Sequence, residues 1–249
     1  MTALDPARLV LVLVEPQQPG NIGAACRAMA NFGVQQLRLV NPCNHLAPEA
    51  VKFAVSASPL LGQAERFSDL PAALADLHFS VALTRRLGRL RGQPEELPRL
   101  PGKLASLPSA SRIALVFGRE DKGLTTAELM ACSSAATIAT PGDKGSLNLA
   151  QAVVVTLYEL TRSAPAVVDT PAAALALPNH QQIESLMRPV EELIDRIGYS
   201  NPSRPEVIPA ALRRLLARAL PDPAEINLLR GLVEQLSQSV QDWPGKRRG

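Results

Sequence analysis

Aromatic residues, cysteine and histidine are all scarce in this chain of 249 residues. Phenylalanine, tryptophan and tyrosine together make up 3% of it, and it holds only three cysteines and three histidines. The cysteines, Cys26, Cys43 and Cys132, are far apart and form no CxxC pair. A structural zinc site needs several such ligands at close spacing. We therefore expect free thiols and no bound metal.

Long hydrophobic runs are also missing. The apolar run over residues 9–14 is far shorter than the ~18 residues that a membrane-spanning helix needs. It also lacks the charged lead and the cleavage site of a signal peptide. A hydrophobic content of 46% excludes a disordered chain. We therefore expect a soluble, cytoplasmic protein without membrane contact.

Positive charge comes mainly from arginine, with 21 arginines against five lysines. Residues 1–163 carry 16 basic and 13 acidic side chains, whereas residues 164–249 carry ten of each. The arginine fork matches phosphate oxygens, which is consistent with a phosphate-bearing partner. A GC-rich coding bias explains the same surplus, and composition alone favours that simpler interpretation.

The first two thirds of the chain alternate between strand and helix patterns. Continuous apolar runs predict strands over residues 8–14, 36–40, 78–84, 112–118 and 135–139. Cap residues and apolar periodicity predict helices over residues 21–31 (capped by Asn21), 50–56, 70–77 (capped by Asp69), 126–132 and 147–161. This order is typical of an α/β domain with a mostly parallel sheet.

The last third of the chain has a different pattern. Residues 164–178 are rich in alanine and proline, as in a linker. Helical periodicity follows over residues 180–197, 208–220 and 223–240, the first helix capped by Asn179. We therefore expect an α/β domain over residues 1–163, a linker over 164–178 and a small all-α domain over 179–249.

Three glycine-bearing loops follow predicted strands, at the sheet edge where parallel α/β proteins bind ligands. They are residues 15–33, 117–124 and 138–151. A capped helix, a solvated turn and an N-capping serine account for much of them. Those simple interpretations leave the charges of residues 119–122 unexplained, together with Asn148 and Gln151 at the start of an apolar helix.

A fourth loop, residues 84–92, carries Arg85, Arg86, Arg89 and Arg91 just past a predicted strand. Phosphate contact and a solvated face explain this run equally well. No GxGxxG motif follows the first strand, so a Rossmann-type nucleotide-binding protein is disfavoured.

The three glycine-bearing loops, in this order, resemble the SpoU branch of the SPOUT superfamily of RNA methyltransferases. NIGAACRAMANFG (residues 21–33) resembles its motif 1, IALVFGREDKGLT (113–125) motif 2 and IATPGDKGSLNLAQAV (138–153) motif 3. Within that branch the chain is most similar to the TrmJ-type tRNA (cytidine/uridine-32) 2′-O-methyltransferases. The features that carry this closer resemblance are Asn41-Pro42 after one predicted strand, Thr84-Arg85 after another, and the helical extension.

The resemblance implies an α/β domain with a deep trefoil knot near its C-terminal end, and a homodimer with the active site at its interface. It implies S-adenosylmethionine-dependent 2′-O-methylation of a ribose in tRNA, at nucleotide 32 of the anticodon loop. The catalytic residues that it implies are Arg27, Asn21, Glu120, Ser146 and Asn148. The residues that it implies for the methyl donor are Thr84, Arg85, Arg86, Phe117, Gly118, Ile138, Ser146, Leu147 and Asn148.

Several alternatives stay open at this point. The family proposal makes Arg27 a general base, but a guanidinium stays protonated in proteins, so Arg27 can instead act through its charge. The substrate could be ribosomal RNA, or the chain could be an RNA-binding module without catalysis. The helical part could serve dimerisation, tRNA binding or both. Few aromatics predict that RNA is held through phosphate, ribose and shape rather than by base stacking.

Overall fold

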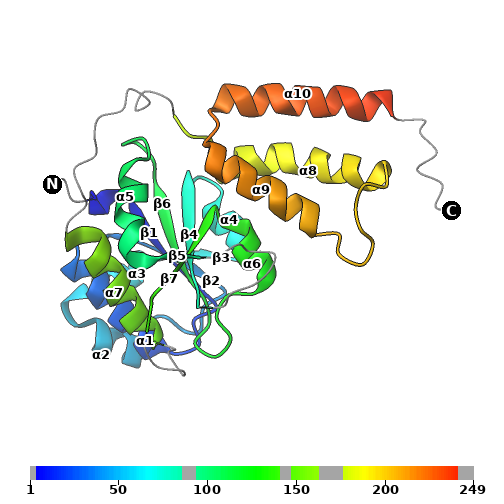
Figure 1. Cartoon of the computed structure of the whole chain (residues 1–249). Coiled ribbons are helices and arrows are strands. Elements are labelled where there is room, and N and C mark those ends of the chain that lie inside the picture. Colours follow the sequence, from blue (N-terminus) through cyan, green and yellow to red (C-terminus); the bar gives the residue numbers. More distant parts are fainter. Residues whose placement is uncertain (1–3, 86–93, 141–146, 163–175, 241–249) are drawn as a thin grey trace.

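The computed structural model describes residues 4–85, 94–140, 147–162 and 176–240. Within these ranges seven parallel strands form one sheet with helices on both faces, and three further helices lie together to one side (Figure 1). The strand order is β3-β2-β1-β6-β4-β7-β5. The expected α/β fold with a mostly parallel sheet and a C-terminal helical part is confirmed.

The elements that the sequence predicts are present with similar bounds, and the structure adds others. The strands are β1 (Leu9–Val14), β2 (Gln36–Val40), β3 (Glu65–Phe67), β4 (Phe79–Leu83), β5 (Glu95–Glu96), β6 (Ile113–Phe117) and β7 (Ser134–Thr137). The helices of the α/β part are α1 (Pro19–Asn31), α2 (Pro48–Ala54), α3 (Ser58–Gly62), α4 (Leu70–Leu74), α5 (Leu100–Ala105), α6 (Thr126–Ala131) and α7 (Leu149–Arg162). The helices of the C-terminal part are α8 (His180–Arg196), α9 (Val207–Ala219) and α10 (Pro223–Ser239). The added elements, which the sequence does not predict, are β3, β5, α3 and α5.

The central strand β1 shows why this sheet is covered on both faces. All six of its residues are buried, and alternate side chains point to opposite sides. Its leucines join the core formed with α1 and α7, whereas its valines join the core formed with α4 and α6. A strand buried on both faces reads as a continuous apolar run, which is the pattern of this segment.

The start of α1 differs from the prediction. The sequence predicts Asn21 as the N-cap, but the helix begins at Pro19 and Gln18 is the N-cap. Proline suits the first helical turn, because its fixed φ is helical and its missing N–H has no intrahelical partner there. The side chain of Asn21 is therefore free for other contacts, and only 9% of the residue is exposed.

The C-terminal helices have a small core of their own and are joined to the sheet domain by backbone hydrogen bonds, among them that of the Gln181 N–H to the Ala75 carbonyl at 3.0 Å. Leu186, Met187, Leu216 and Ile226 are buried together between α8, α9 and α10. The N–H of His180 donates to the Leu77 carbonyl at 2.9 Å. These helices therefore begin directly against the end of the α4 segment. The trefoil knot that the resemblance implies near the C-terminal end of the α/β domain stays a prediction.

Candidate active site

A cavity of about 480 Å³ opens at the carboxyl ends of β4, β6 and β7. Its walls combine apolar side chains, such as Leu83 and Leu149, with the polar loop that follows β6. The residues expected for the methyl donor that line it are Thr84, Arg85, Phe117, Gly118, Ile138 and Leu147. Three loops far apart in the sequence thus meet at one edge of the sheet, as the strand order requires.

Two of the expected residues, Arg86 and Ser146, lie outside the described residues. Asn148 is described but does not line this cavity. Its amide nitrogen Nδ2 donates instead to Asn21 Oδ1 at 2.9 Å, and its Oδ1 accepts the Ala150 N–H at 2.9 Å. Asn148 therefore both starts α7 and joins α7 to α1.

Asn21, Glu120 and Asn148 form a continuous hydrogen-bonded cluster. Asn21 Nδ2 donates to Glu120 Oε1 at 2.9 Å, while Asn21 Oδ1 accepts from Asn148. Glu120 also accepts the backbone N–H groups of Gln17 at 2.9 Å and Gln18 at 3.2 Å. Since a carboxylate bound by several N–H donors is held in one orientation, this cluster is preorganised.

Arg27 is the expected catalytic residue that the structure does not bring to this cluster. It lies on α1, is exposed, and forms no hydrogen bond or ion pair with any residue that the structure describes. The fold thus assembles three of the implied catalytic residues within one chain and leaves the arginine at the surface of a helix.

Arg119 is a residue that the sequence analysis missed. Its guanidinium binds Glu128 through two hydrogen bonds, of 3.0 and 2.9 Å, and Glu15 through a third of 2.8 Å. The hydrogen bond from Arg119 lowers the pKa of the Glu15 carboxyl. Glu15 itself has a φ of 45°, which an L-residue rarely adopts. This network ties the end of β1 to the loop after β6 and to α6, so it shapes the floor of the cavity.

Gly118 is required by the same loop. A Cβ at this position would lie 2.3 Å from the carbonyl carbon of Gly123 and 2.4 Å from the nitrogen of Leu124. Only glycine permits this close approach of two backbone segments. The cluster of glycine and charge in residues 117–124 was the signal for this folded loop.

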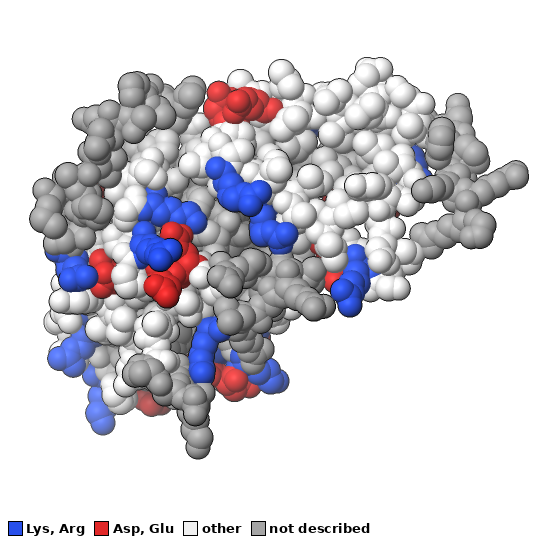
Figure 2. Space-filling model, viewed as in Figure 1, with Lys and Arg blue, Asp and Glu red and all other residues white. Residues whose placement is uncertain are grey.

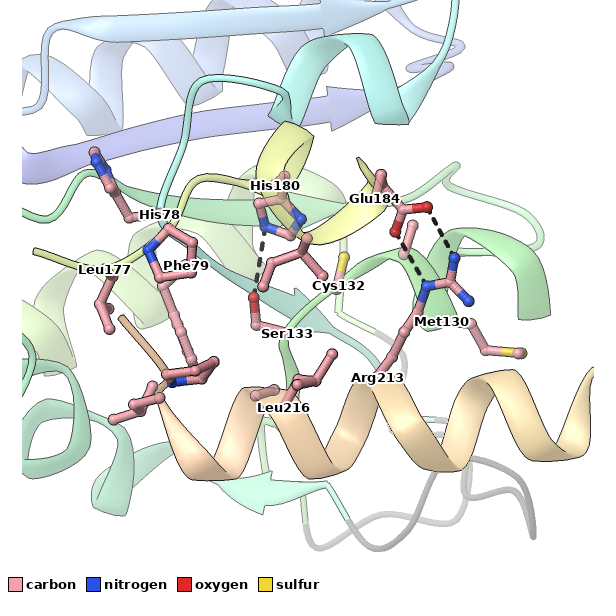
Figure 3. Close-up of a pocket in the computed structure, with 16 residues that line it drawn as sticks. His78, Phe79, Met130, Cys132, Ser133, Leu177, His180, Glu184, Arg213 and Leu216 are labelled. Atoms are coloured by element: carbon pink, nitrogen blue, oxygen red, sulfur yellow. Dashed lines mark hydrogen bonds and ion pairs between the residues drawn. The ribbon is translucent and has the colours of Figure 1, made fainter. Parts of the chain in front are cut away.

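A second, smaller cavity lies between the sheet domain and the helices (Figure 3). Figure 3 shows His180 pointing toward Ser133, at 3.5 Å, and Arg213 paired with Glu184. Burial lowers the pKa of His180 to about 4, so this imidazole is neutral at pH 7. The cavity measures only about 50 Å³, which is too small for a nucleoside-sized ligand, so its polar groups serve the docking of the helices.

Charge on the face seen in Figure 2 is mixed rather than of one sign. Basic and acidic side chains lie next to each other over the sheet domain, whereas the surface over α10 is mostly uncharged in this view. No group of three or more His, Cys, Asp or Glu side chains within the described ranges is arranged to hold a metal ion. None of the helices in those ranges has the length and apolar character needed to cross a membrane.

Two family profiles match this sequence. The profile described as the SpoU rRNA Methylase family matches residues 8–158. The profile described as the C-terminal domain of tRNA methyltransferase TrmJ matches residues 181–244. The first match includes β1, β4, β6, β7 and the cavity at their carboxyl ends, and the second match includes α8 to α10 almost completely.

Characterised relatives and solved structures agree with these profiles. A protein of Cronobacter sakazakii named tRNA (cytidine/uridine-2′-O-)-methyltransferase TrmJ is 35% identical over 240 residues, covering 94% of this chain and 98% of its own. The crystal structure of TrmJ from Z. mobilis ZM4 covers 92% of this chain and 98% of its own, with a TM-score of 0.77 and 29% identity. A probable methylase family protein from Haemophilus influenzae covers 95% and 99%, with a TM-score of 0.60 and 28% identity.

Proposed function

Because the chain belongs to the SpoU methylase family and, within it, to the TrmJ tRNA (cytidine/uridine-2′-O-)-methyltransferases, we propose that it methylates the 2′-hydroxyl of a ribose in tRNA, at nucleotide 32 of the anticodon loop. The observation that carries this proposal is the cluster of Asn21, Glu120 and Asn148, built from the loops that resemble motifs 1, 2 and 3. The cluster joins the donor cavity through Glu120, which lines it.

The cavity fits S-adenosylmethionine. Leu83, Phe117 and Leu149 offer apolar surface for the nucleoside and the methionine chain, while the loop after β6 offers backbone polar groups. The close approach of residues 118 and 123, which a Cβ would prevent, shapes one wall. When bound, S-adenosylmethionine supplies an electrophilic methyl group on a sulfonium sulfur. Thr84, Arg85, Gly118, Ile138 and Leu147 would hold it, together with Arg86 and Ser146, whereas the side chain of Asn148 is hydrogen-bonded to Asn21 and does not line the cavity.

The chain's own residues position the ribose. The amide groups of Asn21 and Asn148 are fixed by their mutual hydrogen bond and by Glu120, so they present constant dipoles to the acceptor. Arg27 contributes its positive charge at the phosphate and the 2′-oxygen, because a guanidinium stays protonated and cannot take the proton itself. This charge favours the alkoxide character that the oxygen gains in the reaction.

We propose that the working enzyme is a homodimer and that Arg27 completes the active site of its partner. Two observations support this. Arg27 is exposed on α1 and makes no contact with its own cluster among the described residues. The neighbouring helix α7, which packs on α1, exposes Val154, Val155 and Tyr158, with exposed fractions of 42%, 37% and 54%. An apolar surface of this kind beside an unpaired arginine is suited to an interface.

We keep the division into residues 1–163, 164–178 and 179–249, and the trefoil knot, as parts of the same proposal. The two family profiles match residues 8–158 and 181–244, on either side of the proposed linker. The buried clusters of α1 to α7 and of α8 to α10 are separate, and Leu177, at the end of the proposed linker, belongs to the first of them. The helical part is proposed to contact tRNA or the second subunit.

The test is methyl transfer from labelled S-adenosylmethionine to unmodified tRNA transcripts, followed by mapping of the methylated ribose. We expect one 2′-O-methyl group, at nucleotide 32. Methylation of ribosomal RNA alone would place the chain in another group of the SpoU family. Binding of tRNA without any methyl transfer would favour the RNA-binding module.

A further inference from the structure

Another cavity opens at the same carboxyl edge of the sheet, at the ends of β2 and β3. It has a volume of about 460 Å³ and is formed by residues 41–46, which follow β2, and by Arg66 and Phe67 of β3. This volume lies in the range of small-molecule sites. None of the residues assigned above to the methyl donor or to the catalytic cluster lines it.

The loop that forms this cavity is fixed by hydrogen bonds. Asn41 has a φ of 41°, a conformation that costs free energy in a residue other than glycine. Its N–H donates to the Phe67 carbonyl at 3.1 Å, and its Nδ2 donates to the Ser68 carbonyl at 2.6 Å. The N–H of Leu46 donates to Asn44 Oδ1 at 3.2 Å. The cavity is therefore preformed rather than assembled by a ligand.

Two side chains of the cavity lack the partners that their chemistry calls for. His45 is only 9% exposed, yet its ring makes no hydrogen bond to any described residue. Arg66 is exposed and has neither an ion pair nor a hydrogen bond within the described ranges. The imidazole of His45 and the guanidinium of Arg66 are therefore both available to a ligand in the cavity that supplies hydrogen-bond acceptors.

The cavity adjoins the catalytic cluster through residues 16–18. The Pro16 carbonyl accepts the N–H of Cys43, a residue that lines the cavity, at 3.1 Å. The next two N–H groups, of Gln17 and Gln18, donate to Glu120. Together with burial, the charge of Glu120 raises the pKa of the Cys43 thiol, which shows how near the two sites are.

We propose that this cavity binds the phosphodiester of the tRNA strand beside the nucleotide that is methylated, with Arg66 as the phosphate ligand and His45 as a hydrogen-bond donor. The inference rests on the proposed function, since it places the neighbouring nucleotide of the same substrate. An arginine fork and phosphate oxygens form strong charge-assisted hydrogen bonds. No acidic side chain lines the cavity itself.

Cys43 provides a local probe of this site in the full-length protein. It is a free, partly buried cysteine that lines the cavity, whereas Cys26 is buried in the core. Alkylation by N-ethylmaleimide is followed at Cys43 by peptide mass spectrometry, with unmodified tRNA transcript or with AMP. We expect tRNA to slow the alkylation of Cys43 at least fivefold and AMP to leave it unchanged. Equal protection by AMP alone would mean a free-nucleotide site and would overturn the proposal.

Substitution of the phosphate ligand gives a second, independent measurement. In Arg66→Met we expect the KM for tRNA to rise about tenfold, with unchanged affinity for S-adenosylmethionine. The salt dependence of tRNA binding should fall by ~0.9 in slope, as for one lost phosphate contact. Arg99→Met, which removes an exposed arginine between β5 and α5, at the opposite edge of the sheet, is the matched control and should leave the slope unchanged.

Failure of the phosphate-site proposal and failure of the proposed enzyme function would give different results. If the unaltered protein methylates tRNA but tRNA does not protect Cys43, and Arg66→Met behaves like Arg99→Met, the phosphate site is refuted and the enzyme function stands. If the unaltered protein transfers no methyl group to tRNA, the proposed function itself is refuted.

Discussion

At the scale of single residues, each amide of the catalytic cluster has one fixed direction of hydrogen bonding. Asn148 must donate through Nδ2, because Asn21 Oδ1 is its acceptor, and Asn21 must then donate to Glu120. Glu120 can only accept when ionised. The hydrogen bonds therefore all point the same way, from Asn148 to Asn21 and from Asn21 to Glu120. A substitution that keeps the shape of one of these side chains but removes its N–H donor should disrupt this series of hydrogen bonds.

Asn148→Asp is such a change. It replaces the donating amide by a carboxylate that faces Asn21 Oδ1, so we expect kcat for tRNA methylation to fall about 100-fold, with the fold intact by circular dichroism. Gln151→Glu is the control. Its Oε1 accepts the N–H of Asn148, and a carboxylate accepts equally well, so activity should stay within about twofold. Equal loss in both variants would contradict the assigned directions.

Asp76 gives a residue-scale prediction about stability. Its carboxylate binds the buried Arg38 at 2.9 Å and also binds Arg112. The hydrogen bond from Arg38 holds the pKa of Asp76 well below its usual value. A carboxyl with a lowered pKa in the folded state stabilises the protein above its unfolded pKa of ~3.9 and loses this contribution as the pH falls below it.

We expect Asp76→Asn to lower the free energy of unfolding by about 2 kcal/mol at pH 7, allowing for the exposure of about half of this side chain to solvent. The difference from the unaltered protein should shrink as the pH falls below ~4. Urea unfolding at pH 7 and pH 3.5 measures both. Glu65→Gln, which removes a longer and exposed contact to Arg38, should cost less than about 0.5 kcal/mol. A constant difference at both pH values would argue against the ion pair.

At the scale of elements, the sequence predicts strands and helices whose side chains are buried. It misses short strands that form only because their backbones pair with a neighbouring strand. The run of residues 9–14 is apolar on both faces and predicts β1 directly. In contrast, β3 and β5 have three and two residues and are rich in charge. They are strands only because their backbones pair with β2 and β7 at the two edges of the sheet, which no local pattern reveals.

The site shows the same division. The motif resemblance selected Asn21, Glu120 and Asn148, and the expectation of a mostly parallel sheet predicted that their loops share an edge. The prediction that Asn21 caps α1 is nevertheless wrong, because sequence alone does not distinguish a capping asparagine from one whose amide is buried. Arg119 was missed because its partners, Glu15 and Glu128, are 104 and 9 positions away. Such long-range pairs follow from the fold and not from spacing.

Alanine substitution at two helix glycines should change the stability of the protein in opposite directions. Gly231 lies in the interior of α10, and an added Cβ there would meet no atom within 4 Å. Gly231→Ala should therefore stabilise the protein by about 0.5–1 kcal/mol through helix propensity. In α1, a Cβ at Gly23 would lie 2.1 Å from the Ala50 carbonyl oxygen. Gly23→Ala should destabilise by about 1–3 kcal/mol. Thermal unfolding of both variants checks this, and stabilisation by both would contradict the α1–α2 contact.

At the scale of the whole molecule, the absence of a described contact between Arg27 and the cluster is the feature on which the proposed homodimer rests. Within one chain the described contacts of Asn21, Glu120 and Asn148 do not include Arg27. If Arg27 serves the partner's cluster, each active site combines residues of both chains. Variants of Arg27 and of Asn148 then complement each other only in a mixed dimer.

A mixed dimer of Arg27→Ala and Asn148→Asp chains, purified through two different tags, tests this arrangement. One of its two sites would hold both intact residues, so we expect about half of the activity of the unaltered dimer. Each variant alone should be nearly inactive. If Arg27 instead acts within its own chain, both sites of the mixed dimer are damaged and the activity stays near that of the single variants.

The central claim is that this chain methylates one ribose oxygen of tRNA, and a change of a single substrate atom tests it most directly. Two tRNA transcripts are compared, one with a 2′-deoxyribose at nucleotide 32 and the other with a 2′-deoxyribose at nucleotide 34. With labelled S-adenosylmethionine, the account predicts no methyl transfer to the first and normal transfer to the second. Normal methylation of the transcript that lacks the 2′-hydroxyl at nucleotide 32 would contradict it.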